Sequence, residues 1–166
     1  LIAHGDDHGA VLPPKVAPTQ VVIIPIPSKE KDVQIKKACE EIATRLKEAR
    51  FRVELDTRDD LTPFAKYYYW EMRGVPVRIE IGPRDIKQDE VTIVQRDTLE
   101  KQTCKTDELV KVVRGLMAKM MEEMRQRAWH WMNTHVRKAG NLEELKQLVK
   151  KRVGIIEVLW CGEAQC

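Results

Sequence analysis

Apolar residues follow two different spacings along the chain, and the changes between them mark the expected elements. Residues Val21–Ile26 are almost wholly apolar, which is typical of a strand covered on both faces. Apolar residues then recur every three or four positions up to about Arg50, the spacing of an amphipathic helix that Ser28 can cap. Phe51–Leu55 reads as a second strand. This strand–helix–strand order predicts two parallel strands joined by a crossover helix.

A helix, a break and a strand follow one another in the middle of the chain. Thr62 can cap a helix that begins at Pro63, where the missing N–H costs little. Gly74 and the Val-Pro pair that follows it end this helix. Apolar and polar residues alternate over Val75–Ile81, which predicts a half-buried strand. The next four residues, Gly82–Asp85, predict a turn.

The last third of the chain reads as two helices and two strands. Val91–Val94 is a plausible strand that pairs with the preceding one across a hairpin. Asp107–His135 reads as one long helix, and Asn141 can cap a shorter helix from Leu142 to about Lys151. Ile155–Trp160 is a last apolar strand. The apolar stripe of the long helix is Leu109, Val113, Leu116, Met120, Met124, Ala128 and Trp131.

Aromatic, acidic and basic residues gather around the central helix and strand. Tyr67 and Glu71 are four residues apart and share one helix face. Arg78 lies on the strand, and Arg84 and Asp85 follow in the turn. A ring, carboxylates and arginines suit an unpaired guanine, because a carboxylate can accept from its N1–H and N2–H while arginine addresses O6 and N7. The alternative is an aromatic core helix beside a strand whose charges face water.

Two more basic residues follow the strand at Val91–Val94. Arg96 and Lys101 are candidates for contacts with phosphate groups near the end of the sheet. Solvated surface charge is an equally good interpretation of both.

Composition sets wide bounds on the class of protein. Of 166 residues, 43% are hydrophobic and 33% are charged, which excludes a disordered tail and a membrane protein. A net charge of +3 permits a nucleic-acid partner without requiring one. The chain begins with Leu1, not Met, and no signal-peptide pattern follows. The four cysteines do not form a secreted disulfide framework, which favours a reducing cytoplasm.

Two groups of residues invite a metal interpretation. The polar residues of His4–His8 are crowded into one loop, and we expect a polar turn there rather than a metal site. Cys161 and Cys166 supply half of a tetrahedral zinc site, and closed sites need four ligands. Cys39 lies within a helix stripe, so we expect a small core residue.

Longer motifs resemble a known family. KYYYWEMR followed by GVPVRIEIGPRD resembles the anticodon-binding domain of prolyl-tRNA synthetases of the archaeal and eukaryotic type. HGDD followed by GAVLPPKVAP resembles the end of motif 3 in the class II catalytic domain, and WCGEAQC looks like the first half of the family's C-terminal zinc-binding domain. The resemblance implies residues 1–18 as the end of the catalytic domain and a linker, 19–104 as the anticodon-binding domain, and 105–166 as a long connecting helix and a truncated zinc-type domain.

The resemblance also implies a fold. We expect an α/β protein with a mixed five-stranded-type sheet flanked by helices, followed by a long helix and a small α+β segment. Enzymes of this family join proline to ATP, with Mg²⁺, and transfer it to tRNA(Pro), and they are expected to be cytoplasmic homodimers. The motif 3 arginine that grips ATP lies upstream in the family, so no catalytic residue is expected here and the fragment alone should be inactive.

Site residues follow from the same resemblance. Proline anticodons end in two guanines, which Glu71 and Asp85 would accept from and Arg78 and Arg84 would donate to, with Tyr67 stacking and Lys101 as a further contact. His4, Gly5 and Asp6 would lie near the ATP and adenylate site, and Cys161 and Cys166 would bind zinc. Two alternatives stay open: a non-enzymatic RNA-binding accessory module, and a metal-dependent hydrolase that uses the His4–His8 cluster.

Overall fold

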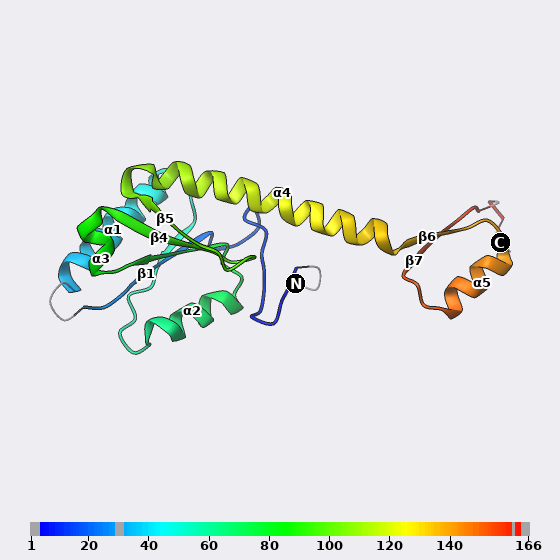
Figure 1. Ribbon diagram of the computed structural model, residues 1–166, viewed down its shortest axis with the longest axis horizontal. Coiled ribbons are helices and arrows are strands. Elements are labelled where there is room, and N and C mark those ends of the chain that lie inside the picture. Colours follow the sequence, from blue (N-terminus) through cyan, green and yellow to red (C-terminus); the bar gives the residue numbers. More distant parts are fainter. Residues whose placement is uncertain (1–3, 29–31, 161, 164–166) are drawn as a thin grey trace. The chain divides into compact units, whose positions relative to one another are not determined.

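The computed structural model describes residues 4–28, 32–160 and 162–163. The candidate zinc ligands Cys161 and Cys166 therefore lie outside the described residues. The chain divides into two compact units, Leu1–Met124 and Arg125–Cys166 (Figure 1). Within the described ranges, no helix is long and apolar enough to span a membrane.

A five-stranded mixed sheet forms the centre of the first unit. Strand β1 is parallel to β2 and to β3, whereas β4 is antiparallel to both β3 and β5. The order across the sheet is β2-β1-β3-β4-β5, which confirms the mixed sheet expected from the sequence. The strands are β1 Val21–Pro25, β2 Val53–Leu55, β3 Val77–Ile81, β4 Glu90–Gln95 and β5 Lys101–Lys105.

Helices connect and cover these strands. They are α1 Asp32–Glu48, α2 Pro63–Met72, α3 Pro83–Gln88, the short 3₁₀ helix η1 Thr106–Glu108 and α4 Leu109–His135. As expected, the Thr62 hydroxyl caps α2 by accepting from the Ala65 N–H at 3.3 Å. Gly74 ends the helix region with φ +69°, and a Cβ there would lie 2.8 Å from the Ala10 carbonyl oxygen. Glycine is therefore required at this position by both conformation and space.

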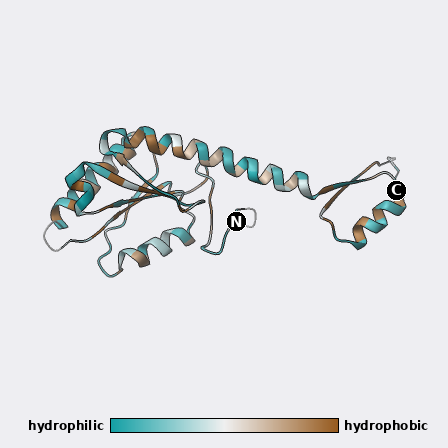
Figure 2. Cartoon of the chain, in the orientation of Figure 1, coloured by the Kyte–Doolittle hydropathy of each residue, from teal (hydrophilic) through white to brown (hydrophobic). Residues whose placement is uncertain are grey.

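The two faces of the sheet are covered differently. On one face, β-strand residues pack against α1 and α4, with Ile23, Ile79 and Leu46 fully buried. Each such side chain contributes about 1.5–3 kcal/mol through its burial. On the other face, α2 packs Tyr67 and Trp70 against a small cluster of Val22, Ile24 and Val75. Figure 2 shows mainly apolar residues along the strands of the large sheet, whereas the helices carry both apolar and polar residues.

Strand β3 and the segment after it differ from the prediction. All five β3 residues are buried, and Arg78 and Glu80 are each only 8% exposed, so the expectation of a half-buried strand was wrong. The polar side chains lie on the face that α2 covers, where they pair with each other instead of with water. The expected turn at Gly82–Asp85 is instead the start of α3, with Gly82 as N-cap and Pro83 in the first turn. Glycine followed by proline is compatible with both a turn and a helix start.

Strand β5 has no counterpart in the sequence pattern. Its sequence, KQTCK, contains no apolar alternation, and four of its five residues are exposed. It pairs with β4 at the edge of the sheet, and its Cys104 packs against the core. An edge strand gains its structure from main-chain hydrogen bonds to its neighbour, so side-chain periodicity does not reveal it.

The second unit begins within α4. Strands β6 Val136–Ala139 and β7 Ile155–Val158 are parallel and are joined through α5 Leu142–Lys150. The side chain of Asn141 caps α5 as expected, accepting from the Glu144 N–H at 2.9 Å. The predicted apolar stripe of α4 was too long, because its buried residues end at Met124, whereas Ala128 and Trp131 are exposed.

Candidate nucleic-acid interface

The register of the sheet brings distant polar residues into rows. Residues paired across neighbouring strands project from the same face. One such row crosses β1, β3, β4 and β5 and consists of Val22, Arg78, Val94 and Lys101. The next row places Glu80 between Ile24 and Thr92. Arg78, Glu80 and Lys101 therefore lie together on the face that α2 partly covers.

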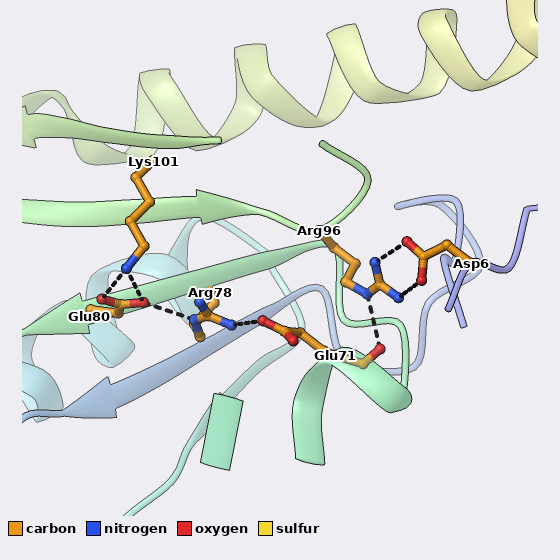
Figure 3. A network of polar contacts seen from close by, with 6 residues as sticks. All are labelled: Asp6, Glu71, Arg78, Glu80, Arg96 and Lys101. Atoms are coloured by element: carbon orange, nitrogen blue, oxygen red, sulfur yellow. Dashed lines mark hydrogen bonds and ion pairs between the residues drawn. The ribbon is translucent and has the colours of Figure 1, made fainter. Parts of the chain in front are cut away.

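An ion-pair chain of alternating charge joins α2 to this face (Figure 3). Arg78 donates to Glu71 at 2.5 Å and, through Nε, to Glu80 at 3.0 Å. Glu80 also pairs with Lys101 at 3.3 Å. The side chains of Glu71, Arg78 and Glu80 are about one-tenth exposed, whereas Lys101 is 56% exposed. Buried charges require such partners, so the chain fixes the orientation of three groups and leaves its last cation near solvent.

The Tyr67 ring lies against the two cations of the ion-pair chain, Arg78 and Lys101. The guanidinium carbon of Arg78 is 4.1 Å from the ring centroid, and the Lys101 ammonium is 5.9 Å from it, both within range for a cation–π contact. Burial raises the pKa of the Tyr67 hydroxyl, and the charge of Glu80 raises it further. The hydroxyl therefore keeps its proton at neutral pH and can donate it to the Glu80 carboxylate.

An open hollow lies beside Tyr67 and the ion-pair chain. One wall is the face of α2 that carries residues at positions 64, 67, 68 and 71, which share a helix face. Phe64 and Tyr68 on this wall are 71% and 62% exposed. The sequence reasoning named only Tyr67, although the same three- and four-residue spacing links both rings to Glu71. The hollow is lined by His8, Phe64, Tyr67, Tyr68, Glu71, Arg78, Val94, Leu99 and Lys101.

Asp85 and Arg84 lie at the start of α3, in different situations. The Asp85 carboxylate accepts from the Gly82 N–H at 2.8 Å and from the Thr92 hydroxyl at 3.1 Å. Because Thr92 pairs with Glu80, these bonds hold Asp85 beside the polar row of β3. Arg84 is exposed, and among the residues that the structure describes it makes no hydrogen bond or ion pair. The structure therefore gives Asp85 a capping role and leaves the Arg84 side chain in solvent.

Arg96 links the N-terminal loop to α2. Its guanidinium donates to both Asp6 carboxylate oxygens, at 2.6 and 2.7 Å, and its Nε donates to the Glu71 carbonyl oxygen at 3.0 Å (Figure 3). These hydrogen bonds from Arg96 lower the pKa of Asp6 to about 2. The Arg96 side chain is only 2% exposed. Both interpretations of Arg96, as a phosphate contact and as a solvated surface charge, were therefore wrong, because the side chain is buried and paired within the protein.

The N-terminal loop is a polar turn seated on the end of α2. Asp6 and Gly9 form a β-bridge, and the Ala10 N–H donates to the Met72 carbonyl at 3.2 Å. A Cβ on Gly9 would lie 2.6 Å from the Met72 Cα, so the close approach requires glycine. His4 is partly exposed, whereas Gly5 and Asp6 are exposed in the same loop. The candidate adenylate-site residues are thus brought next to the helix that carries Glu71.

Possible metal ligands do not cluster in the part of the chain that the structure describes. Within residues 4–28, 32–160 and 162–163, no group of three or more histidine, cysteine or acidic side chains could hold a metal ion. Cys39 is buried, as expected for a core residue, and burial raises the pKa of its thiol to about 12. A thiol that stays protonated is a poor nucleophile and a poor metal ligand.

A second buried polar cluster fastens α2 to the end of β2. The Asp56 carboxylate is 1% exposed and accepts from the Trp70 Nε1–H at 2.8 Å and from the Arg58 guanidinium. Burial acts to raise the pKa of Asp56, but the bonds from Arg58 and Trp70 and the charge of Lys66 outweigh it, and the pKa is lowered. The sequence reasoning treated this segment as a charged loop and missed the cluster. It holds the helix that forms one wall of the hollow.

The chain is similar to known proteins over much or all of its length. Residues 20–116 match the family described as "Anticodon binding domain". The chain belongs to the anticodon-binding domain family. Its whole length is 48% identical to a proline--tRNA ligase of Pyrococcus abyssi and 47% identical to one of Methanothermobacter thermautotrophicus, covering 34% of each protein. A third such relative, from Thermococcus kodakarensis, is 45% identical with the same coverage. The chain thus spans about a third of the length of these curated relatives.

Proposed function

We propose that the chain is the C-terminal, anticodon-reading part of a class II proline–tRNA ligase. Similarity along the whole chain to proteins named proline--tRNA ligase supports the choice of enzyme. The observation that carries the RNA-reading role is the ion-pair chain beside the Tyr67 ring. It runs from Glu71 through Arg78 and Glu80 to Lys101. It places acceptors, donors and a ring at the edge of one open hollow.

The hollow and the neighbouring start of α3, which carries Arg84 and Asp85, would together bind the two guanines that end a proline anticodon. Glu71 and Asp85 would accept from guanine N–H groups, and Arg78 and Arg84 would donate to guanine oxygen and nitrogen acceptors. Tyr67 would stack on a base, and the exposed Lys101 would contact a phosphate. Because the ion-pair chain already orders Glu71 and Arg78, binding would exchange contacts rather than order free side chains, which lowers its entropic cost.

The remainder of the proposed enzyme would supply the chemistry. It would join proline to ATP, with Mg²⁺, and pass the activated proline to tRNA(Pro), as a cytoplasmic homodimer. Residues 1–18 would be the end of its catalytic domain, 19–104 the anticodon-binding domain, and 105–166 the connecting helix and zinc-type domain. His4, Gly5 and Asp6 would lie near the adenylate site. Since Arg96 takes both Asp6 oxygens, we propose that Asp6 fastens this loop and does not bind the Mg²⁺.

Zinc belongs to the same proposal. Cys161 and Cys166 would each supply a thiolate, and a tetrahedral structural site would need two further ligands. When bound, zinc would cross-link this segment and stabilise its fold.

The test measures the affinity for a stem-loop whose anticodon ends in GG and for a matched stem-loop whose anticodon ends in AA. Both affinities are measured for the wild-type chain and for Glu71→Gln. The glutamine keeps the shape and one oxygen for Arg78 but presents an amide donor to a guanine donor. A mismatched polar pair costs about 1–3 kcal/mol, so GG binding should weaken about tenfold while AA binding changes little. An unchanged ratio of GG to AA affinity in Glu71→Gln, with the fold intact, would show that Glu71 does not read guanine.

A further inference from the structure

The hollow extends beyond the groups assigned to the two guanines. Phe64 and Tyr68 lie on its α2 wall and are the most exposed rings on that wall. The Phe64 and Tyr67 rings meet edge to face, with centroids 5.7 Å apart. Single exposed apolar side chains are common on protein surfaces. Here two exposed rings continue an aromatic surface that begins at Tyr67.

The length of this wall exceeds what two bases need. Positions 64 to 71 of α2 span about 10 Å along the helix axis, at about 1.5 Å per residue. Successive stacked bases are separated by about 3.4 Å. The wall from Phe64 to Glu71 therefore has room for about three stacked bases, one more than the guanine-reading groups account for.

The chemistry of the wall selects the kind of occupant. Lys101 also lines the hollow, and its side chain is 56% exposed, which suits the phosphate backbone that accompanies each base. Phe64 carries no hydrogen-bonding group, and its ring, like that of Tyr68, offers a flat apolar surface. Aromatic rings beside cations bind single-stranded nucleotides by stacking and accept every base, because every base has a π-face. The aromatic wall is continuous with the guanine-reading groups. This continuity favours a further base of the same RNA and gives no advantage to a partner protein.

We propose that Phe64 and Tyr68 form a stacking platform for a third unpaired nucleotide of the bound RNA loop, adjacent to the two guanines. This inference rests on the proposed function, since it places the third base relative to the first two. The platform adds affinity without selectivity: it holds whichever base occupies that position. Selectivity stays with the polar groups around Glu71 and Arg78.

The experiment is a double-mutant cycle that combines removal of the two protein rings with removal of single RNA bases. Affinities are measured for the full 166-residue chain and for Phe64→Leu/Tyr68→Leu, using a GG stem-loop. In a matched set of stem-loops, an abasic site replaces one loop nucleotide at a time, at every loop position except the two guanines. The double variant should bind the intact loop about tenfold more weakly, in line with the loss of one stacked base. One abasic loop should weaken the wild-type chain by a similar factor and leave the double variant almost unchanged.

Tyr69→Leu is the matched control. It removes a tyrosine from the neighbouring position, but that ring lies between the Arg58 and Arg73 guanidiniums, 4.1 and 3.8 Å from its centroid, and does not line the hollow. Its affinity for RNA should equal that of the wild-type chain. Thermal unfolding of all variants checks the fold.

The outcomes separate this inference from the proposed function. If the wild-type chain prefers GG over AA but no abasic position couples to Phe64 and Tyr68, the platform is overturned and guanine reading stands. If one abasic position couples but GG and AA loops bind equally, the platform stands and guanine reading is overturned. Equal weakening by Tyr69→Leu would also overturn the platform, because the effect would then not be specific to the hollow.

Discussion

Asp6 and Arg96 are 90 residues apart in the sequence and are joined by two hydrogen bonds of 2.6 and 2.7 Å. The same guanidinium donates to the main-chain carbonyl of Glu71. One buried cation therefore holds the N-terminal loop, the end of β4 and the C-terminal part of α2 together. This contact physically connects the loop that we propose near the adenylate site to the helix that carries the proposed guanine acceptor.

The Asp6–Arg96 pair predicts an acid-sensitive contribution to stability. The pKa of Asp6 falls from 3.8 to about 2 on folding, so its contribution is complete above pH ~4 and is lost as the pH falls through about 2. The Asp6 side chain is 38% exposed, and solvent screening reduces the expected contribution to about 1 kcal/mol. Urea unfolding should show Asp6→Asn less stable than wild type at pH 6 and nearly equal to it at pH 2. Asp7→Asn, at an exposed neighbour, should match wild type at both; a gap for Asp6→Asn that persists at pH 2 would contradict the prediction.

Removing Arg78 should destabilise the fold as well as RNA binding. Arg78→Met leaves the Glu71 and Glu80 carboxylates nearly buried without their shared cation, a change that costs about 3–5 kcal/mol. Adding Glu71→Gln and Glu80→Gln removes both stranded charges and should restore much of the lost stability. Chemical denaturation of the single and triple variants measures this. A triple variant no more stable than Arg78→Met would show that the charges are not the cause.

Arg84 should matter for binding and not for folding. It is exposed and makes no ion pair with any described residue, so Arg84→Ala should change unfolding free energy by less than about 0.5 kcal/mol. Affinity for a GG stem-loop should fall. The dependence of affinity on salt then distinguishes its contact: a phosphate contact lowers the slope by about one, whereas a base contact largely preserves it. Lys87→Ala, an exposed cation on the same helix, is the control, and equal losses for both would indicate only a general charge effect.

Two glycines should respond oppositely to alanine. Gly9 has φ +121°, and a Cβ would lie 2.6 Å from the Met72 Cα, so Gly9→Ala should cost more than about 1 kcal/mol and loosen the N-terminal loop. Gly115 lies within α4 and a Cβ there meets nothing within 4 Å among the described residues. Gly115→Ala should therefore stabilise the protein by about 1 kcal/mol. Thermal unfolding checks both, and a stabilising Gly9→Ala would show that the loop is not seated as described.

Local signals predicted much of the fold. The Thr62 and Asn141 caps, the core position of Cys39 and the strand at β1 follow from residue type and spacing, and the structure confirms them. The burial of Arg78 and Glu80 could not be read in this way, because it depends on α2 crossing the polar side of β3. A period of two shows which residues share a face but not whether another element covers that face.

The candidate site likewise contains some features that local sequence signals predicted and others that they did not. Tyr67 and Glu71 share a helix face by spacing alone, so their proximity was predictable. Their link to Lys101 requires β5, which the sequence pattern did not reveal, and the pairing of Arg96 with Asp6 requires a contact across most of the domain. Such long-range ion pairs leave no periodic signal. Spacing places Phe64 and Tyr68 on the helix face of Glu71, but their exposure was not predictable, since exposure depends on what packs nearby.

The position of β5 at the edge of the sheet has a consequence for self-association. An edge strand offers unpaired main-chain groups to which a strand of another molecule could add. Lysines stand at both ends of β5, Lys101 and Lys105, and both side chains are 56% exposed. Two copies brought edge to edge would place these charges close together, which opposes intermolecular strand pairing. We therefore expect Lys101, the lysine proposed to meet a phosphate, also to oppose pairing between β5 edges when no RNA is bound.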